Sequence, residues 1–128
     1  MPCVRIATGN WAVGIEMKLI EAVQSALVSA FKIPEWDRDV VLDLYDENRR
    51  IVSTGRSERY TRIEIIGIAA RSMEAKRALF KAIADNLEAV GVPRTETRIF
   101  LVEPPPENWG VKGGIPASEA DLGFKVEV

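Results

Sequence analysis

The 128-residue sequence contains no histidine. Histidine is the side chain whose unperturbed pKa lies nearest to neutrality, so its absence removes the most common proton carrier of enzyme active sites. Catalytic pairs of serine or cysteine with histidine are therefore excluded. Proton transfer near pH 7 has to use a carboxylate or lysine of perturbed pKa, or an α-amino group, whose ordinary pKa is about 7.7–8.0.

Features of secreted, membrane-bound and metal-binding proteins are also scarce. Cys3 is the one cysteine, which rules out an internal disulfide and, without histidine, argues against zinc and haem sites. The sequence has no apolar run long enough to span a bilayer and no signal-peptide pattern, so we expect a cytoplasmic protein with no membrane partner. A net charge of −2 makes nucleic acid an unexpected partner, because nucleic-acid binders are usually basic.

One stretch departs from this balanced charge, "DENRRIVSTGRSERY" at residues 46–60. Its polarity and its glycine predict a solvated loop between two strands. Its arginines leave open a second interpretation, in which the loop binds an anion or a nucleic-acid backbone.

We expect a single domain over residues 1–128, because a chain of this length with 47 % hydrophobic residues buries one core. The chain also contains a weak internal repeat, about residues 1–59 and 60–128. "IPEWDRDVVLDLYDEN" resembles "VPRTETRIFLVEPPPEN", with Pro34 and Pro93 standing 59 positions apart. The same shift places the opening strand over the β-branched segment "TRIEIIGI" at residues 61–68.

Two segments between the strands have the period of amphipathic helices, and Ser72 is the expected N-cap of the second. Each half then has the order strand–helix–strand, which makes its two strands parallel. The predicted fold is of the α/β class, an α+β sandwich. Two consecutive β-α-β units form a four-stranded mixed sheet with two helices on one face, plus a short C-terminal strand, "FKVEV" at residues 124–128. The helical stripes consist of Ile15, Leu19, Val23, Leu27 and Phe31, and of Leu79, Ile83, Leu87 and Val90.

This arrangement leaves the other face of the sheet uncovered. The proline- and glycine-rich tail, residues 103–128, is not a regular helix, and its Trp109 and Phe124 indicate that it docks onto the body. We therefore expect the chain to form an oligomer through the bare face or through the tail.

Several motifs, in a consistent order and spacing, resemble the tautomerase superfamily. They are "MP" directly before the first strand, "ARSMEAKRALFKAIADNL" at residues 70–87 and "TRIFLVEPPPENWGVKGG" at residues 97–114. The last two resemble 4-oxalocrotonate tautomerase, and the length matches the fused, double-length form. "FKIPEWDR" and "ENW" are most similar to the malonate semialdehyde decarboxylase-like branch. The resemblance implies a homotrimer with active sites near the amino-terminal prolines, and no metal or organic cofactor.

The resemblance also implies roles for five residues. Pro2 stands at the catalytic amino-terminal proline. Arg71 stands at the arginine that binds a substrate carboxylate, and Arg98 at the arginine that contacts the carbonyl or carboxylate side of the substrate. Trp109 stands at an aromatic wall, and Asp37 at an acidic residue that assists the proline or a water molecule.

Each of these residues also has an ordinary structural interpretation. Proline often starts an edge strand, and a tryptophan is often a packing residue. For the charged residues, the ordinary roles are a solvated Arg71 at the helix start, Arg98 paired with Glu96 or Glu103, and Asp37 in a turn or paired with Arg38.

The implied chemistry depends on removal of Met1, which makes the Pro2 nitrogen a free secondary amine. Burial and nearby guanidinium groups lower the pKa of such an amine, which suits a base acting near pH 7. Arginines hold a carboxylate and stabilise negative charge that develops on oxygen. The sequence thus predicts an isomerase, a keto–enol tautomerase of a small 2-oxo or enol carboxylic acid, such as an enolised arylpyruvate or a dienol diacid.

Two departures from the family pattern keep further functions open. "GNWAVG" at residues 9–14 lacks the arginine of the corresponding motif, and Ala69 stands where the decarboxylase branch has a second arginine. The alternatives are a hydratase, dehalogenase or decarboxylase of a three-carbon acid on the same fold, and a non-enzymatic oligomeric binding module.

Overall fold

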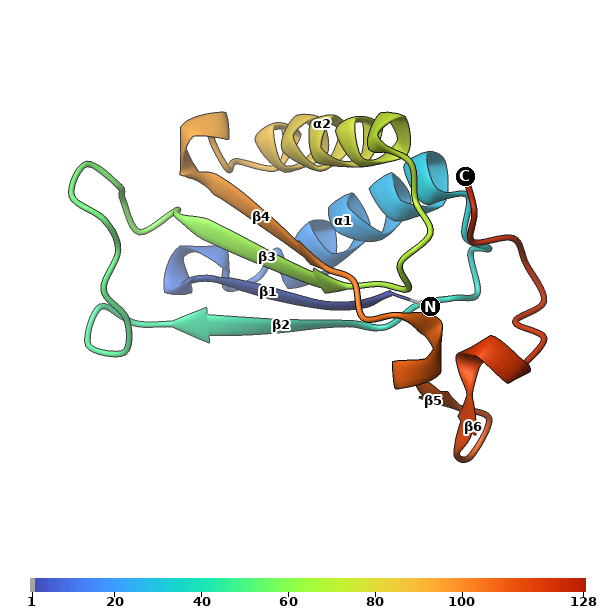
Figure 1. Ribbon diagram of the computed structural model, residues 1–128. Coiled ribbons are helices and arrows are strands. Elements are labelled where there is room, and N and C mark those ends of the chain that lie inside the picture. The colour runs from blue at the N-terminus through green and yellow to red at the C-terminus, as the bar shows by residue number, and fades with distance from the viewer. Residues whose placement is uncertain (1) are drawn as a thin grey trace.

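The computed structural model describes residues 2–128, whose main elements form two β-α-β units (Figure 1). The strands lie in the order β2-β1-β3-β4, with parallel pairing inside each unit and antiparallel pairing between β1 and β3. Both helices cover the same face of the sheet (Figure 1). The predicted mixed sheet is confirmed. The first unit is β1 (Cys3–Gly9), α1 (Glu16–Phe31) and β2 (Val40–Tyr45); the second is β3 (Thr61–Ile66), α2 (Met73–Ala89) and β4 (Thr97–Val102).

The helices form where the sequence places an apolar stripe and a boundary residue. Ser72 is the N-cap of α2, as predicted, and its hydroxyl accepts a hydrogen bond from the Ala75 N–H at 3.1 Å. Lys32 ends α1 in the left-handed region, at φ 58°. The side chains that point into the core from the two helices include Leu19, Val23, Leu27 and Phe31, and Leu79, Ile83 and Leu87.

The central strands alternate between a buried and an open side. Val4, Ile6, Ile63 and Ile65 are at most 3 % exposed under the helices, and pack into one core with the helix stripes. The opposite side of the sheet carries charged side chains together with exposed apolar ones, Val41, Ile66, Phe100 and Val102. We call this side, which no other element of residues 2–128 covers in Figure 1, the bare face.

The tail differs in part from its prediction. Short strands do occur in it, β5 (Gly110–Val111) and β6 (Ile115–Pro116), which form an antiparallel hairpin. Residues 124–128, however, are not a strand, contrary to the sequence-based expectation. Phe124 and Val128 pack against the main core, and the Val128 carbonyl accepts a hydrogen bond from the Ser72 N–H at 2.9 Å. The N–H of Ser72, at the start of α2, therefore satisfies the Val128 carbonyl.

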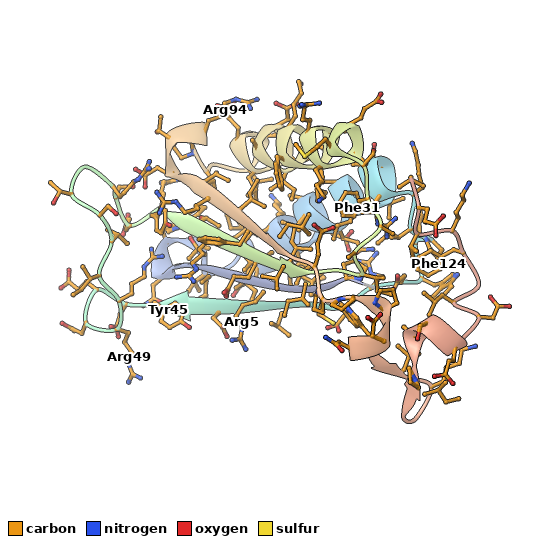
Figure 2. All side chains as sticks on the ribbon, viewed as in Figure 1. Arg5, Phe31, Tyr45, Arg49, Arg94 and Phe124 are labelled. Atoms are coloured by element: carbon orange, nitrogen blue, oxygen red, sulfur yellow. The ribbon has the colours of Figure 1, made fainter. Side chains whose placement is uncertain are left out.

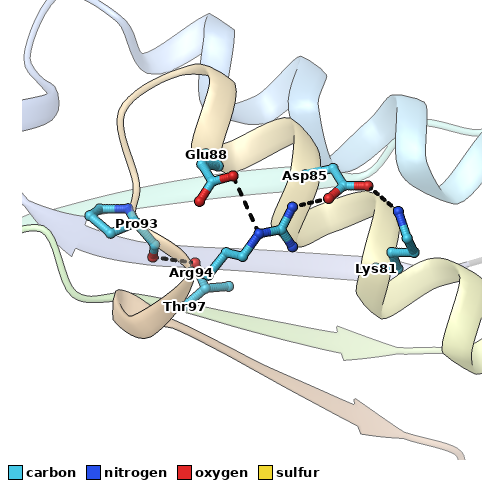
Figure 3. A network of polar contacts seen from close by, with 6 residues as sticks. All are labelled: Lys81, Asp85, Glu88, Pro93, Arg94 and Thr97. Atoms are coloured by element: carbon cyan, nitrogen blue, oxygen red, sulfur yellow. Dashed lines mark hydrogen bonds and ion pairs between the residues drawn. The ribbon is translucent and has the colours of Figure 1, made fainter.

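A network of charged side chains ties the outer surface of α2 to the turn that leads into β4 (Figure 3). Asp85 binds Lys81 at 2.8 Å and also Arg94, whose Nε lies 3.3 Å from Glu88 Oε1. Hydrogen bonds from Lys81 and Arg94 lower the pKa of Asp85. Each exposed ion pair contributes little to the free energy of unfolding, so we infer that this network mainly holds the turn against α2. No helix within residues 2–128 is long and apolar enough to cross a membrane.

Candidate active site

The sheet register brings several loops to one end of the molecule. Cys3 pairs with Ile66, Val4 with Val40, and Ile66 with Val102, so β1 and β2 begin where β3 and β4 end. The chain segments next to these positions are Pro2, residues 32–39, residues 67–72 and residues 103–109. We call this part of the molecule the proline end.

Pro2 is buried directly before β1. The backbone on its C-terminal side is fixed, because the Val4 N–H donates to the Asp39 carbonyl at 2.9 Å. The expected removal of Met1 concerns a residue that lies outside the described part of the chain. The structure thus places the candidate base in a buried position at the proline end.

Arg71 precedes α2, where the positive end of the helix dipole disfavours a cation. Its guanidinium instead contacts the last residue of α1: Nη1 donates to the Phe31 carbonyl at 2.9 Å, and Cζ lies 4.7 Å from the centre of the Phe31 ring. Arg71 therefore meets the negative end of the α1 dipole and an aromatic face. Figure 2 shows Phe31 beneath the helix layer at this end of the sheet.

Burial lowers the pKa of Arg71, and the negative charges of Asp37 and Glu103 oppose that shift. Arginine nevertheless stays charged at any physiological pH. Its Nε–H is buried and meets no acceptor among residues 2–128. An unsatisfied buried donor costs about 1–3 kcal/mol. The guanidinium thus keeps hydrogen-bonding capacity that the described chain does not use.

Asp37 lies in the loop between α1 and β2. Its N–H donates to the Pro34 carbonyl at 3.0 Å, and its own carbonyl accepts from Gln24 Nε2 at 3.1 Å. The negative charge of its carboxylate raises the pKa of Arg71, against the larger opposite effect of burial. The neighbouring Arg38 bonds to Glu21 of α1.

Trp109 belongs to the tail, on the proline end. Its Nε1 donates to the Pro104 carbonyl at 3.2 Å, and its ring packs against a small cluster that contains Ile68 and Val111. Ile68 directly follows β3, so this cluster fastens the tail to the sheet. The structure thus gives Trp109 a packing contact at the same end as Pro2.

Arg98 is the predicted site residue that the structure does not bring to Pro2. It lies on β4 in register with Arg62, exposed, and Val102 at the proline end is four residues further on. At about 3.3 Å per residue, roughly 13 Å of strand separates them. The pairings expected for it go elsewhere, because Glu96 accepts from Ser57 and Glu103 pairs with Lys76. Arg98 sits toward the opposite end of the sheet, which we call the loop end because residues 46–60 cover it.

Sequence reasoning missed three residues at the proline end. Gln24 and Phe31 hold Asp37 and Arg71 through contacts that reach 13 and 40 positions along the chain. Cys3 is, from the sequence, no more than a small packing residue. Burial and a hydrogen bond with Asp39 raise its pKa to about 11, so the thiol stays protonated beside Pro2. In the sequence, the position of the polar Gln24 next to Val23 of the apolar helix stripe is the signal that could have indicated these contacts.

Two hollows mark the surface. A groove of about 360 Å³ lies on the bare face at the proline end, lined by Cys3, Val41, Ile66 and Val102 among others. A larger hollow of about 630 Å³ lies at the loop end, between acidic and basic side chains of residues 45–58. Its size does not make it the site, because it holds neither Pro2 nor Arg71. Within residues 2–128, no three histidine, cysteine, aspartate or glutamate side chains gather to hold a metal ion.

The chain is similar to known tautomerases. The family model described as "Tautomerase enzyme" matches residues 37–112, which is more than half of the chain. A 2-hydroxymuconate tautomerase of Comamonas testosteroni is 37 % identical over 51 residues, which cover 39 % of this chain and 81 % of that protein.

Solved structures share the whole architecture. A malonate semialdehyde decarboxylase inhibited by 3-bromopropiolate is 28 % identical, with a TM-score of 0.75, over 85 % of this chain and 88 % of the other. A fused 4-OT described as a wild-type symmetric trimer is 25 % identical, with a TM-score of 0.73, over 91 % of this chain and 95 % of the other. With its two β-α-β units in one polypeptide, the chain belongs to the tautomerase superfamily, in its fused form.

Proposed function

We propose that the chain is a tautomerase that interconverts the keto and enol forms of a small 2-oxo carboxylic acid at the proline end. The observation that carries the proposal is the gathering of buried Pro2, Asp37 and a partly unsatisfied Arg71 at one end of the sheet. The isomerase activity of relatives in the same family supports it.

The proposed base is the secondary amine of Pro2 after removal of Met1. Burial and the nearby guanidinium both disfavour the ammonium form, so both lower the pKa of this amine toward neutrality. In ketonisation, the amine removes the enol hydroxyl proton as the C2=O bond forms. The electron pair of the C2=C3 bond then takes a proton from the ammonium at C3. The proton count balances, and the step needs no cofactor.

The arginines bind the substrate in this proposal. The guanidinium of Arg71 holds the carboxylate, and Asp37 orients the proline or a water molecule. Trp109 provides an apolar wall near the substrate. Arg98 acts in the site of a neighbouring chain, because roughly 13 Å of strand separates it from the proline end of its own chain. A homotrimer built on the bare face supplies that neighbour, and the trimeric fused 4-OT supports such an assembly.

A second candidate is decarboxylation, hydration or dehalogenation of a three-carbon acid. The likeness to a malonate semialdehyde decarboxylase and the position of Asp37 favour it. Ala69, at the position of that branch's second arginine, favours the tautomerase. Incubation with malonate semialdehyde and with 3-haloacrylates separates the two, and turnover of either acid would replace the first proposal by the second.

The primary test is ketonisation of phenylenolpyruvate by protein that mass spectrometry shows to lack Met1. The enol absorbance should decay faster than in buffer, and Pro2→Ala should remove most of that acceleration. Protein that retains Met1 should be inactive, because its Pro2 nitrogen is an amide. Equal rates for wild type and Pro2→Ala would overturn the assignment of the base.

A further inference from the structure

Gln24 lies on the core side of α1, where an amide side chain is out of place. It is 3 % exposed, between the fully buried Val23 and Leu27. The other buried polar side chains of residues 2–128 are Thr8, Thr61 and Glu96, all at the loop end. Gln24 is thus the buried polar side chain that serves the proline end.

The hydrogen bond that Gln24 makes explains why an amide is buried there. Burying an unpaired amide costs about 1–3 kcal/mol, whereas methionine fills a similar volume without that cost. Nε2 donates to the main-chain carbonyl of Asp37 at 3.1 Å. The glutamine therefore contributes a specific contact with the loop at residues 32–39, and not only bulk in the core.

Side chains on both sides of Asp37 also attach the loop, because Arg38 bonds to Glu21 of α1 and the Trp36 ring lies edge-on to the Phe124 ring, with 6.0 Å between the ring centres. The bonds from Asp37 N to the Pro34 carbonyl and from Arg38 N to the Trp36 carbonyl lie within the loop, so they shape a turn without fixing it to the body. Before the turn, Ile33 is buried in the core, and after it the Asp39 carbonyl is bonded to β1. Between these anchors, the Gln24 amide ties the Asp37 backbone to α1.

The placement of Asp37 matters for the chemistry. Its negative charge acts on the Arg71 guanidinium and on Cys3, the residue next to Pro2. A carboxylate that moves away changes the field at both positions, since interactions between charges in a partly buried site fall steeply with distance and hydration.

We infer that Gln24 is a positioning residue that fixes the Asp37 main chain and thereby sets where the Asp37 carboxylate lies at the proline end. The inference rests on the proposed function, because it concerns the same site. Gln24 touches no substrate in this arrangement and acts through Asp37.

The first experiment compares Gln24→Met with Thr8→Val. Both variants replace a buried polar side chain by an apolar one of similar volume, the first serving the proline end and the second at the loop end. We expect a loss of about 10-fold or more in kcat for phenylenolpyruvate in Gln24→Met, since small misplacements near reacting atoms have large effects. Thr8→Val should lower the melting temperature and leave kcat unchanged. Equal kcat values for the two variants would overturn the inference.

A double-mutant cycle tests the route through Asp37. In the Asp37→Asn background, Gln24→Met should have no further effect on kcat, because the carboxylate whose position it sets is gone. The pH profile of Gln24→Met should shift in the same direction as that of Asp37→Asn. A Gln24→Met effect that persists undiminished in the Asp37→Asn background contradicts a positioning role.

Amide hydrogen exchange provides a readout that does not depend on activity. Gln24→Met should accelerate exchange at residues 35–38, whereas Thr8→Val should leave these amides unchanged. Unchanged exchange in Gln24→Met refutes the anchoring, whatever the kinetics. Equal rates for wild type and Pro2→Ala, with faster exchange in Gln24→Met, would instead refute the proposed function and keep the contact with Asp37.

Discussion

Pro2 and Thr61 stand 59 positions apart, at the start of corresponding strands on opposite ends of the sheet. The same offset relates Asp37 at the proline end to Glu96 at the loop end. The two acids differ in what they contact. The charge of Asp37 acts on the Arg71 guanidinium, whereas both oxygens of the buried Glu96 accept from the Ser57 N–H, at 3.0 and 3.1 Å.

At the loop end, buried polar side chains form hydrogen bonds with one another and with nearby main-chain groups. The hydroxyls of Thr8 and Thr61 are 2.9 Å apart, Thr8 also accepts from Trp11 Nε1, and Thr61 donates to the Arg59 carbonyl. The Arg59 guanidinium lies 4.5 Å from the Trp11 ring centre and donates to the Gly91 carbonyl. Figure 2 shows Tyr45 and Arg49 at this end, away from Phe31 and Phe124.

The difference separates an end whose buried polar groups bond to one another from an end that keeps unused hydrogen-bonding capacity. At the loop end, the buried side chains of Thr8, Thr61 and Glu96 are paired inside the chain, and a paired polar network adds rigidity. At the proline end, a guanidinium Nε–H stays without an acceptor in residues 2–128, and Pro2 is buried at the same end. Natural proteins accept such local costs mainly where they serve binding or catalysis.

The largest expected contrast is between Pro2→Ala and Thr61→Val. Pro2→Ala should lower kcat about 10²-fold with little change in melting temperature, because it removes a rigid base. Thr61→Val should cost about 1–3 kcal/mol in the free energy of unfolding, because it breaks a buried and a partly buried hydrogen bond, and should leave kcat unchanged. Steady-state kinetics and urea unfolding measure both. A lower kcat in Thr61→Val would contradict the assignment of catalysis to the proline end alone.

The next contrast uses one arginine from each end. Arg71→Ala should raise KM about 10-fold or more, because a charge-assisted hydrogen bond to a carboxylate contributes about 1.5–3 kcal/mol. Arg59→Ala should lower stability by about 1 kcal/mol through loss of its contacts with Trp11 and Gly91, without changing KM. KM for phenylenolpyruvate and thermal melts provide the comparison. An unchanged KM in Arg71→Ala would remove this residue from the binding site.

Glycine substitutions test how tightly each end is packed. A Cβ at Gly9 would lie 2.4 Å from the Glu58 carbonyl, a backbone atom that cannot move aside easily. Gly9→Ala should therefore cost about 1–3 kcal/mol. A Cβ at Gly67, at the proline end, meets only Leu101 Cδ1 at 3.9 Å, so Gly67→Ala should be nearly neutral. The urea unfolding midpoints of the two variants measure these losses of stability. Equal losses would mean that both ends are packed equally tightly.

The smallest effect concerns Cys3, a built-in probe of the proline end. Thiol reagents react with the thiolate, so the labelling rate should rise half-maximally at pH about 11 in folded protein, against the ordinary 9.0. The folded thiol holds its proton more tightly, and this contribution to stability is lost as pH rises from 9.0 to about 11. Asp39→Asn should shift the labelling curve to lower pH. A curve centred at the ordinary value in wild type would contradict the burial of this thiol.

Local signals made the body of the fold predictable. Stripes with helical period, β-branched strands and the Ser72 cap each specify an element from neighbouring residues, and all of them agree with the structure. The strand expected at residues 124–128 is wrong because an alternating pattern fits a strand whether or not a sheet edge is free. In the structure, the Val128 carbonyl instead bonds to the Ser72 N–H at the start of α2.

The candidate site was less predictable because its contacts join distant segments. No local pattern places the Phe31 carbonyl under Arg71 or the Gln24 amide under Asp37. The family resemblance named Arg71, Asp37 and Pro2, and the structure places them at one end. It also named Arg98, but strand direction, which sequence similarity does not report, puts that residue near the other end.

The bond between Arg71 and the Phe31 carbonyl has a thermodynamic consequence. It joins the segment before α2 to the end of α1, so the two β-α-β units share this guanidinium. A carboxylic acid that binds Arg71 only in the folded chain shifts the unfolding equilibrium by mass action, by about 2.7 kcal/mol at 100 times its Kd. The melting temperature thereby reports occupancy without any turnover. A library of 2-oxo acids ranked by thermal shift, with Arg71→Ala as the blank, identifies the ligand class from heat stability alone.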